Sequence, residues 1–148
     1  MDNWFSNFKP FDIPMFYGLY RYKTPEHFYQ AMKTNNKKQR HAIATAKTPG
    51  EAKRLGRRCT IKPNWEKEKI EVMEYALSYK FRKGTELNKR LLETKGRIVE
   101  WNTWHDNEWG SCTCSKCKSI KGNILLGKLL MKIRLQSKLG KAPYYDNE

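Results

Sequence analysis

Three polar residues that could act together stand at helical spacing near residue 30. Glu26, Gln30 and Lys33 occupy positions i, i+4 and i+7, so a helix would place them on one face, with Tyr29 beside it. They offer a carboxyl group that can transfer protons, an amide that can hydrogen-bond, and an amine that is nucleophilic when neutral. The same spacing is also typical of an exposed polar stripe on a surface helix. Spacing alone leaves both interpretations open.

A second polar segment, residues 101–110, places indole rings among polar side chains. It contains another carboxylate, Asp106, followed by Trp109 and Gly110. Exposed indoles lower solubility unless they pack or stack on a ligand, whereas Trp is highly buried on average in folded proteins. The segment therefore belongs either to a binding site or to the hydrophobic core.

Three of the four cysteines, Cys112, Cys114 and Cys117, lie close together in the sequence, and Cys59 stands apart. A structural zinc ion needs four ligands, so Cys59 or His105 would have to complete such a site. The alternative is a set of reduced thiols in an ordinary connecting loop. On this pattern we assign no metal ligand and expect no cofactor.

The order of the expected elements indicates an α+β fold that is predominantly helical, with a small sheet. Aromatic residues and prolines in the first twenty positions favour short strands and turns. The β-branched alternation of residues 97–101 predicts a strand. Capping residues and apolar periodicity predict helices over residues 24–36, 48–56, 64–81, 86–93 and 123–139.

Length and composition exclude several classes of protein. The 148 residues fit one domain spanning 1–148, and 39% hydrophobic content with 13% aromatic residues excludes a disordered polycation. The sequence has no apolar run of membrane-helix length and no signal-peptide pattern, so we expect a cytoplasmic protein without a membrane partner.

The formal net charge of +15 is unevenly distributed along the chain. Residues 21–62 carry a net +10 and residues 110–148 a net +6, on either side of a neutral middle. This distribution favours a phosphorylated or polyanionic partner. A solvated basic surface is the alternative.

Several blocks of the sequence form an ordered series along the chain. The blocks are Phe5–Phe8, Thr24–Lys33, Ala52–Arg57, Trp65 with Val72-Met73 and Lys80-Phe81, Asp106 with Trp109-Gly110, and Asn123–Met131. In this order they follow the pattern of the NADAR superfamily, and the chain resembles the YbiA-like N-glycosidases of that family. The resemblance runs from about residue 5 to residue 134, which leaves residues 135–148 as a C-terminal extension.

This resemblance implies hydrolysis of an N-glycosidic bond between a phosphorylated ribose or ADP-ribose and a nucleobase-like amine. The family's substrates are phosphoribosylamino-pyrimidine intermediates of riboflavin synthesis and ADP-ribosylated guanine. The implied partner is therefore a phosphorylated ribosyl or ADP-ribosyl substrate, with nucleic acid as the carrier in the second case. Sequence does not choose between the two.

The family motifs also imply roles for individual residues. Breaking the bond requires a proton for the departing base, which Glu26 would supply, and Lys33 would hold the sugar as a Schiff base if its pKa is lowered. Asp106 is the third residue expected to be catalytic. The expected substrate contacts are Asn7, Tyr29, Gln30, Arg54, Arg57, Trp65, Trp109 and Gly110.

Two alternatives remain open at this point. Arg54 and Arg57 suit phosphate because arginine binds it through a fork of donors, but they also fit a solvated basic turn. The whole chain could instead be a non-catalytic basic module that binds nucleic acid or ADP-ribose through charge and aromatic stacking. The presence of Glu26, Lys33 and Asp106 favours the enzyme.

Overall fold

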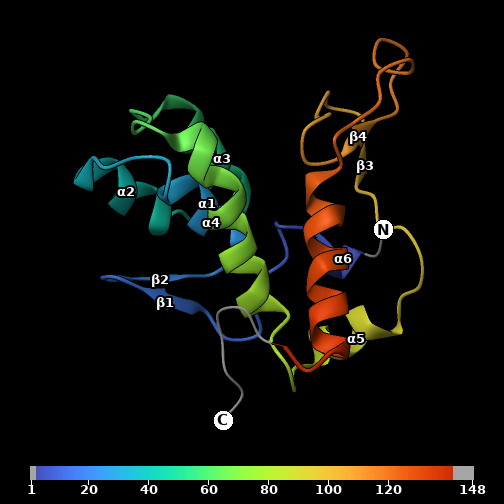
Figure 1. The fold of residues 1–148 in the computed structure, drawn as a ribbon. Helices are drawn as coiled ribbons and strands as arrows, with labels where there is room; N and C mark the ends of the chain where they lie inside the picture. Colours follow the sequence, from blue (N-terminus) through green and yellow to red (C-terminus); the bar gives the residue numbers. More distant parts are fainter. Residues whose placement is uncertain (1–2, 142–148) are drawn as a thin grey trace. The chain divides into compact units, whose positions relative to one another are not determined.

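The computed structural model describes residues 3–141, which divide into two units (Figure 1). Residues 7–80 form the N-terminal unit, and residues 3–6 with 81–141 form the C-terminal unit. That residues 1–148 make one domain stays a prediction. Residues 142–148 of the expected C-terminal extension lie outside the described residues.

The N-terminal unit opens with a short antiparallel hairpin, as the first twenty residues predicted. Met15 pairs with Tyr22 and Tyr17 with Tyr20, and Gly18 turns the chain with φ +60, a conformation that glycine adopts without strain. The strands are β1 (Met15–Tyr17) and β2 (Tyr20–Tyr22).

Four helices complete this unit, and α1 is its centre. Every residue of α1 is buried, because the helix packs against each of the other three. Extended threonines cap α1 and α3, as predicted, and proline follows each cap. The helices are α1 (Pro25–Ala31), α2 (Lys37–Ala44), α3 (Pro49–Arg58) and α4 (Trp65–Lys80).

The helix predicted over residues 24–36 is too long, and α2 was missed. Helix α1 ends at Ala31, and Asn36 does not end a helix but begins the next one. Its side chain accepts a hydrogen bond from the N–H of Gln39. Asparagine serves at both kinds of helix terminus, so its presence did not show which of the two it marks.

The C-terminal unit, as far as the structure describes it, contains two α-helices, a short 3-10 helix and one parallel pair of two-residue strands. Trp101 pairs with Ser111 and Asn102 with Cys112. Helices α5 and α6 pack together, and Phe5 contacts Phe81 edge to face at 5.5 Å. The elements are η1 (Asn3–Phe5), α5 (Glu86–Glu93), β3 (Trp101–Asn102), β4 (Ser111–Cys112) and α6 (Leu125–Lys138).

The strand predicted over residues 97–101 is wrong for most of its length. Residues 97–100 are not in a strand, although Ile98 and Val99 are buried. The Ile98 carbonyl lies directly against Gly127 of α6, where a Cβ atom would collide with it. The backbone at Ile98 therefore packs against a helix, and residues 97–100 do not pair with another strand.

No helix among residues 3–141 combines the length and the apolar character that crossing a membrane requires.

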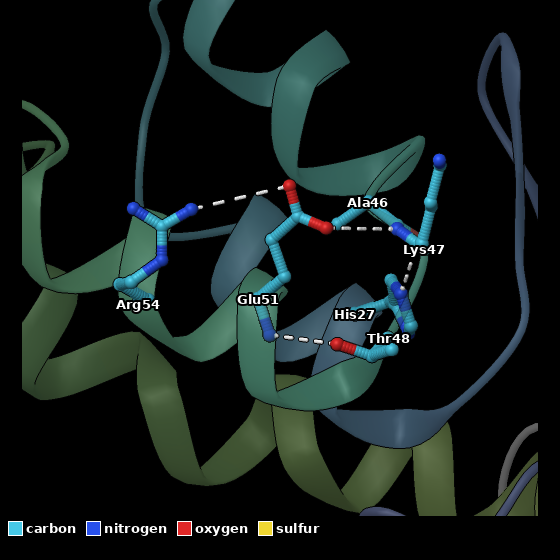
Figure 2. Close-up of polar contacts among 6 residues, drawn as sticks. All are labelled: His27, Ala46, Lys47, Thr48, Glu51 and Arg54. Carbon is cyan, nitrogen blue, oxygen red and sulfur yellow. Dashed lines mark hydrogen bonds and ion pairs between the residues drawn. The ribbon is translucent and has the colours of Figure 1, made fainter.

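A buried histidine joins α1 to the loop before α3 (Figure 2). The Nε2 atom of His27 donates to the Ala46 carbonyl at 3.0 Å, so Nδ1 accepts from the Thr24 hydroxyl at 2.8 Å. Burial lowers the pKa of His27 below its ordinary value. His27 is therefore a neutral structural residue next to Glu26.

Figure 2 also shows how α3 begins. Thr48 accepts from the Glu51 N–H at 3.1 Å, and the Glu51 carboxylate accepts from the Lys47 N–H at 3.2 Å. The two bonds close the helix start in the manner of a capping box. Helix α3 is thereby fixed at the same loop that holds His27.

We expect His27 to make the fold sensitive to acid. The folded state favours the neutral ring of His27. The contribution of His27 to the free energy of unfolding is therefore complete above about pH 6.5, and it is lost as the pH falls toward the lower pKa of the folded state. His27 contributes at most about 1.4 kcal/mol per pH unit to the slope of the free energy of unfolding against pH. Urea unfolding between about pH 5 and about pH 8 measures it. The slope should be smaller in His27→Gln, and an unchanged slope would contradict the assignment.

Candidate active site

The carboxylate of the predicted stripe is buried rather than exposed. Glu26 is 7% exposed and Gln30 is 4% exposed, so the alternative of an exposed surface stripe is wrong. The Gln30 Nε2 atom donates to the Glu26 Oε1 atom at 2.7 Å. A carboxyl group removed from water in this way needs such donors, because its charged form otherwise loses its solvation.

Two buried oxygen atoms beside Glu26 have no hydrogen-bond partner among the described residues. They are Gln30 Oε1 and Asn7 Oδ1. Asn7 lies next to Glu26, because its backbone carbonyl accepts the Glu26 N–H at 3.1 Å. A buried acceptor without a partner costs free energy, so an arrangement of this kind suits a ligand that brings its own donors.

The position of Gln30 depends on a glycine that the sequence reasoning missed. Gly56 lies in α3, and a Cβ atom there would overlap Gln30 Oε1 and stand 2.7 Å from Gln30 Cδ. The predicted helix ended at Gly56, but α3 continues to Arg58. A glycine inside a helix lowers its stability, which was the available signal that something packs closely against this position.

Lys33 lies just past the end of α1, not within it as predicted. Its N–H still bonds to the Gln30 carbonyl at 3.2 Å, which keeps it near the same side of the helix. Burial is the main cause that lowers the Lys33 pKa, and Arg57 and Lys53 lower it further. Glu26 and Cys59 oppose this shift. The pKa of the Lys33 amine therefore depends on its burial and on these four neighbouring groups.

An aromatic pair stands beside this polar group. The rings of Tyr29 and Trp65 meet at 5.1 Å and 60°, and Trp65, the first residue of α4, is 4% exposed. The Lys33 Nζ atom lies 6.0 Å from the centre of the Tyr29 ring. Helices α1 and α4 thus place a buried aromatic pair near the Lys33 amine.

The two predicted phosphate ligands of α3 differ in their surroundings. Both Arg54 and Arg57 are exposed. Arg54 reaches the Glu51 carboxylate at 4.0 Å, an exposed contact that contributes little to stability (Figure 2). Arg57 is close enough to influence the Lys33 pKa. Its position supports a role at the site more directly than that of Arg54.

Three further predicted site residues lie in the C-terminal unit, within one loop. The Asp106 Oδ1 atom accepts the N–H groups of Glu108 and Trp109 at 3.0 and 2.9 Å, which closes a tight turn. A side chain at Gly110 would collide with the Glu100 carbonyl. In this geometry the Asp106 carboxylate shapes the loop that carries Trp109.

The chain matches a known family over almost its whole length: residues 1–137 match the NADAR domain. N-glycosidase YbiA of Escherichia coli K12 is 35% identical over 134 residues, which cover 89% of this chain and 79% of that protein. The solution NMR structure of E. coli YbiA has a TM-score of 0.77 and 32% identity, covering 99% of this chain and 86% of that one.

A plant protein is also similar. The chloroplastic riboflavin biosynthesis protein PYRR of maize is 34% identical over 154 residues, covering 94% of this chain, which spans only 24% of the maize protein's length. An N-glycosidase of Nostoc punctiforme is 35% identical over 88% of this chain and 82% of its own length. Several relatives thus carry the name N-glycosidase, as the sequence resemblance led us to expect. With the domain match and these relatives together, the chain belongs to the NADAR family.

Proposed function

We propose that this chain is an N-glycosidase that hydrolyses the bond between a phosphorylated ribose and a nucleobase-like amine, with Glu26 and Lys33 as its reacting groups. The observation that carries the proposal is the buried Glu26–Gln30 pair beside an amine whose pKa is lowered. The names of the relatives give the reaction class, and that of the maize protein favours a riboflavin-type pyrimidine precursor. ADP-ribosylated guanine is the other substrate of the class.

The reaction begins with proton transfer from Glu26. Protonation of the ribose ring oxygen opens the ring and leaves C1 double-bonded to the nitrogen of the base. The neutral Lys33 amine adds to C1, and the base departs with a proton as a free amine. Water then cleaves the Lys33–C1 imine, which releases the sugar aldehyde and restores the amine.

The neighbouring groups suit the remaining parts of such a substrate. The unpartnered oxygens of Asn7 and Gln30 can accept hydrogen bonds from ribose hydroxyls, and the Tyr29–Trp65 pair offers a surface for the base. Arg57 would bind the phosphate through its fork of donors. Arg57 also lowers the pKa of Lys33, so the same residue would serve both phosphate binding and activation of the amine.

Asp106 and Trp109 keep their expected roles as a proposal. The turn that Asp106 closes fixes the backbone at Trp109, so the carboxylate acts first as a positioning group. A direct part for Asp106 in the chemistry, and contacts from Trp109 and Gly110 to the substrate, rest on the family motif.

Removing the carboxylate should separate catalysis from binding. We expect Glu26→Gln to lower kcat by about 10²- to 10⁴-fold on the true substrate, because the amide cannot transfer the proton. Release of base and sugar from a phosphoribosylamino-pyrimidine and from ADP-ribosylated guanine DNA, followed by chromatography, measures this. Release of the base from only one of the two compounds would identify that compound as the substrate. Binding without release from either would support the non-catalytic module instead.

The lysine route predicts a covalent intermediate that can be trapped. Borohydride added during turnover should reduce the imine and leave the sugar on the peptide that contains Lys33, detected by mass spectrometry. Lys38→Ala, at an exposed position of α2, is the matched control and should still give the adduct. Turnover at the wild-type rate in Lys33→Ala would rule out this route and leave water as the nucleophile.

The glycine of α3 offers a test of positioning. We expect Gly56→Ala to push the Gln30 amide away from Glu26 and to lower kcat/KM by about 100-fold. Gly50→Ala in the same helix is the control, because a Cβ there meets only the Thr48 hydroxyl, at 3.9 Å. Circular dichroism establishes that both variants fold. Equal activity in the two variants would show that Gln30 does not depend on Gly56.

A further inference from the structure

Four metal-binding side chains gather in the C-terminal unit. The ligand atoms of His105, Cys112, Cys114 and Cys117 all lie within 4.8 Å of one another. Cys112 and Cys117 are buried, whereas Cys114 is half-buried and His105 is exposed. The sequence left the fourth member open between Cys59 and His105, and in the structure it is His105.

Hydrogen bonding does not account for this arrangement. The His105 Nδ1 atom lies 3.3 Å from the sulfur of Cys114, 3.4 Å from that of Cys117 and 3.9 Å from that of Cys112. One imidazole nitrogen has either one proton to donate or one lone pair to accept with, so it can serve one of these thiols. Three sulfur atoms around a single nitrogen need another explanation.

The distances match the edges of a tetrahedron around one zinc ion. Bonds of about 2.3 Å to sulfur and about 2.0 Å to nitrogen place those ligand atoms about 3.5 Å apart. The three nitrogen–sulfur distances lie around that value. Three thiolates and one imidazole form a soft donor set that selects zinc over magnesium or calcium.

The backbone is arranged to bring the four ligands together. The Asn107 side chain accepts the Cys112 N–H at 2.9 Å, and the Cys114 N–H points at the Cys112 sulfur at 3.5 Å. A turn follows, in which the Cys117 N–H bonds to the Cys114 carbonyl at 3.1 Å. His105 has φ +67, an uncommon left-handed conformation for a residue with a side chain, and such conformations persist where the surroundings fix them.

We propose that His105, Cys112, Cys114 and Cys117 bind one structural zinc ion. Four protein ligands fill the coordination shell of zinc, which is typical of a structural site and leaves no position for substrate. The ion would join the strand β4 and the turn after it to the start of the Asp106 loop. This proposal is independent of the proposed reaction.

The site would stabilise a part of the unit that has little regular secondary structure. Strands β3 and β4 are two residues each, and the carbonyls of Asn107, Glu108 and Trp109 accept the N–H groups of residues 123, 125 and 126 at the start of α6. Helix α6 has no side-chain cap of its own. A metal-fixed loop would therefore also hold the N-terminus of α6.

Elemental analysis of the full chain, purified without a histidine tag and kept reduced, tests the proposal. We expect about one zinc per chain in the wild type and in Cys59→Ser, and less than about 0.1 in Cys114→Ser. Replacement by cobalt should give the intense visible absorption of a tetrahedral thiolate site, lost in Cys114→Ser. Removal of zinc by a chelator should lower the melting temperature, and zinc but not magnesium should restore it.

The zinc content of the wild type and of the variants distinguishes a zinc site from a set of free thiols. Wild-type protein that holds no zinc even after zinc is supplied, or that holds iron instead, would overturn the proposal. Loss of zinc in Cys59→Ser as large as that in Cys114→Ser would also overturn it, because Cys59 lies outside the cluster. His105→Ala keeps the three thiols and replaces an exposed residue. A weaker affinity for zinc in His105→Ala would support histidine as the fourth ligand. This test holds even if a cysteine variant fails to fold.

Discussion

The hydrogen bond between Gln30 and Glu26 is the contact on which the candidate site depends. It lies inside α1, a helix that is buried along its whole length, so both side chains are removed from water. A carboxyl group in that position needs a fixed donor, and the donor fits only because Gly56 of α3 has no side chain. The close approach of two helices therefore determines how the carboxylate is held, and a threonine side chain caps the N-terminus of each of the two helices.

The charge of the chain gains a specific meaning from this arrangement. A net charge of +15 by itself indicates only that anions are attracted. Near Lys33 the cations also act within the protein, since Arg57 and Lys53 favour the neutral amine, whereas Glu26 and Cys59 favour the charged one. Burial decides the balance and lowers the pKa. A bound phosphate would partly neutralise Arg57, so substrate binding and the protonation of Lys33 are linked.

Local signals in the sequence predicted most helix starts, although not that of α2, and they predicted the tertiary contacts poorly. Threonine caps at the start of α1 and α3 were readable because a cap is a local hydrogen bond. The burial of Glu26 was not readable, because it depends on the packing of α1 against three other helices, and the position of Gln30 beside it depends on Gly56 of α3. The strand over residues 97–101 was wrongly predicted for the same reason, because the backbone at Ile98 packs against Gly127 of α6 rather than in a strand ladder. The family motifs supplied the reaction class, which no spacing could have given.

The loop of the C-terminal unit follows a different physical logic from the buried helix. It has little regular structure, so its backbone groups must find partners among side chains and in the next helix. Asn102 and Asp106 exchange such bonds, the Asn102 amide donating to the Asp106 carbonyl and its oxygen accepting the Asp106 N–H. Polar turns of this kind specify geometry but bury little apolar surface, and they open easily by local unfolding. A metal bond at His105, the neighbour of Asp106, would oppose local unfolding of this turn. The cysteines and the Asp106 turn are therefore best understood as one structural device, in which the metal-binding residues hold the same loop that carries the family motif.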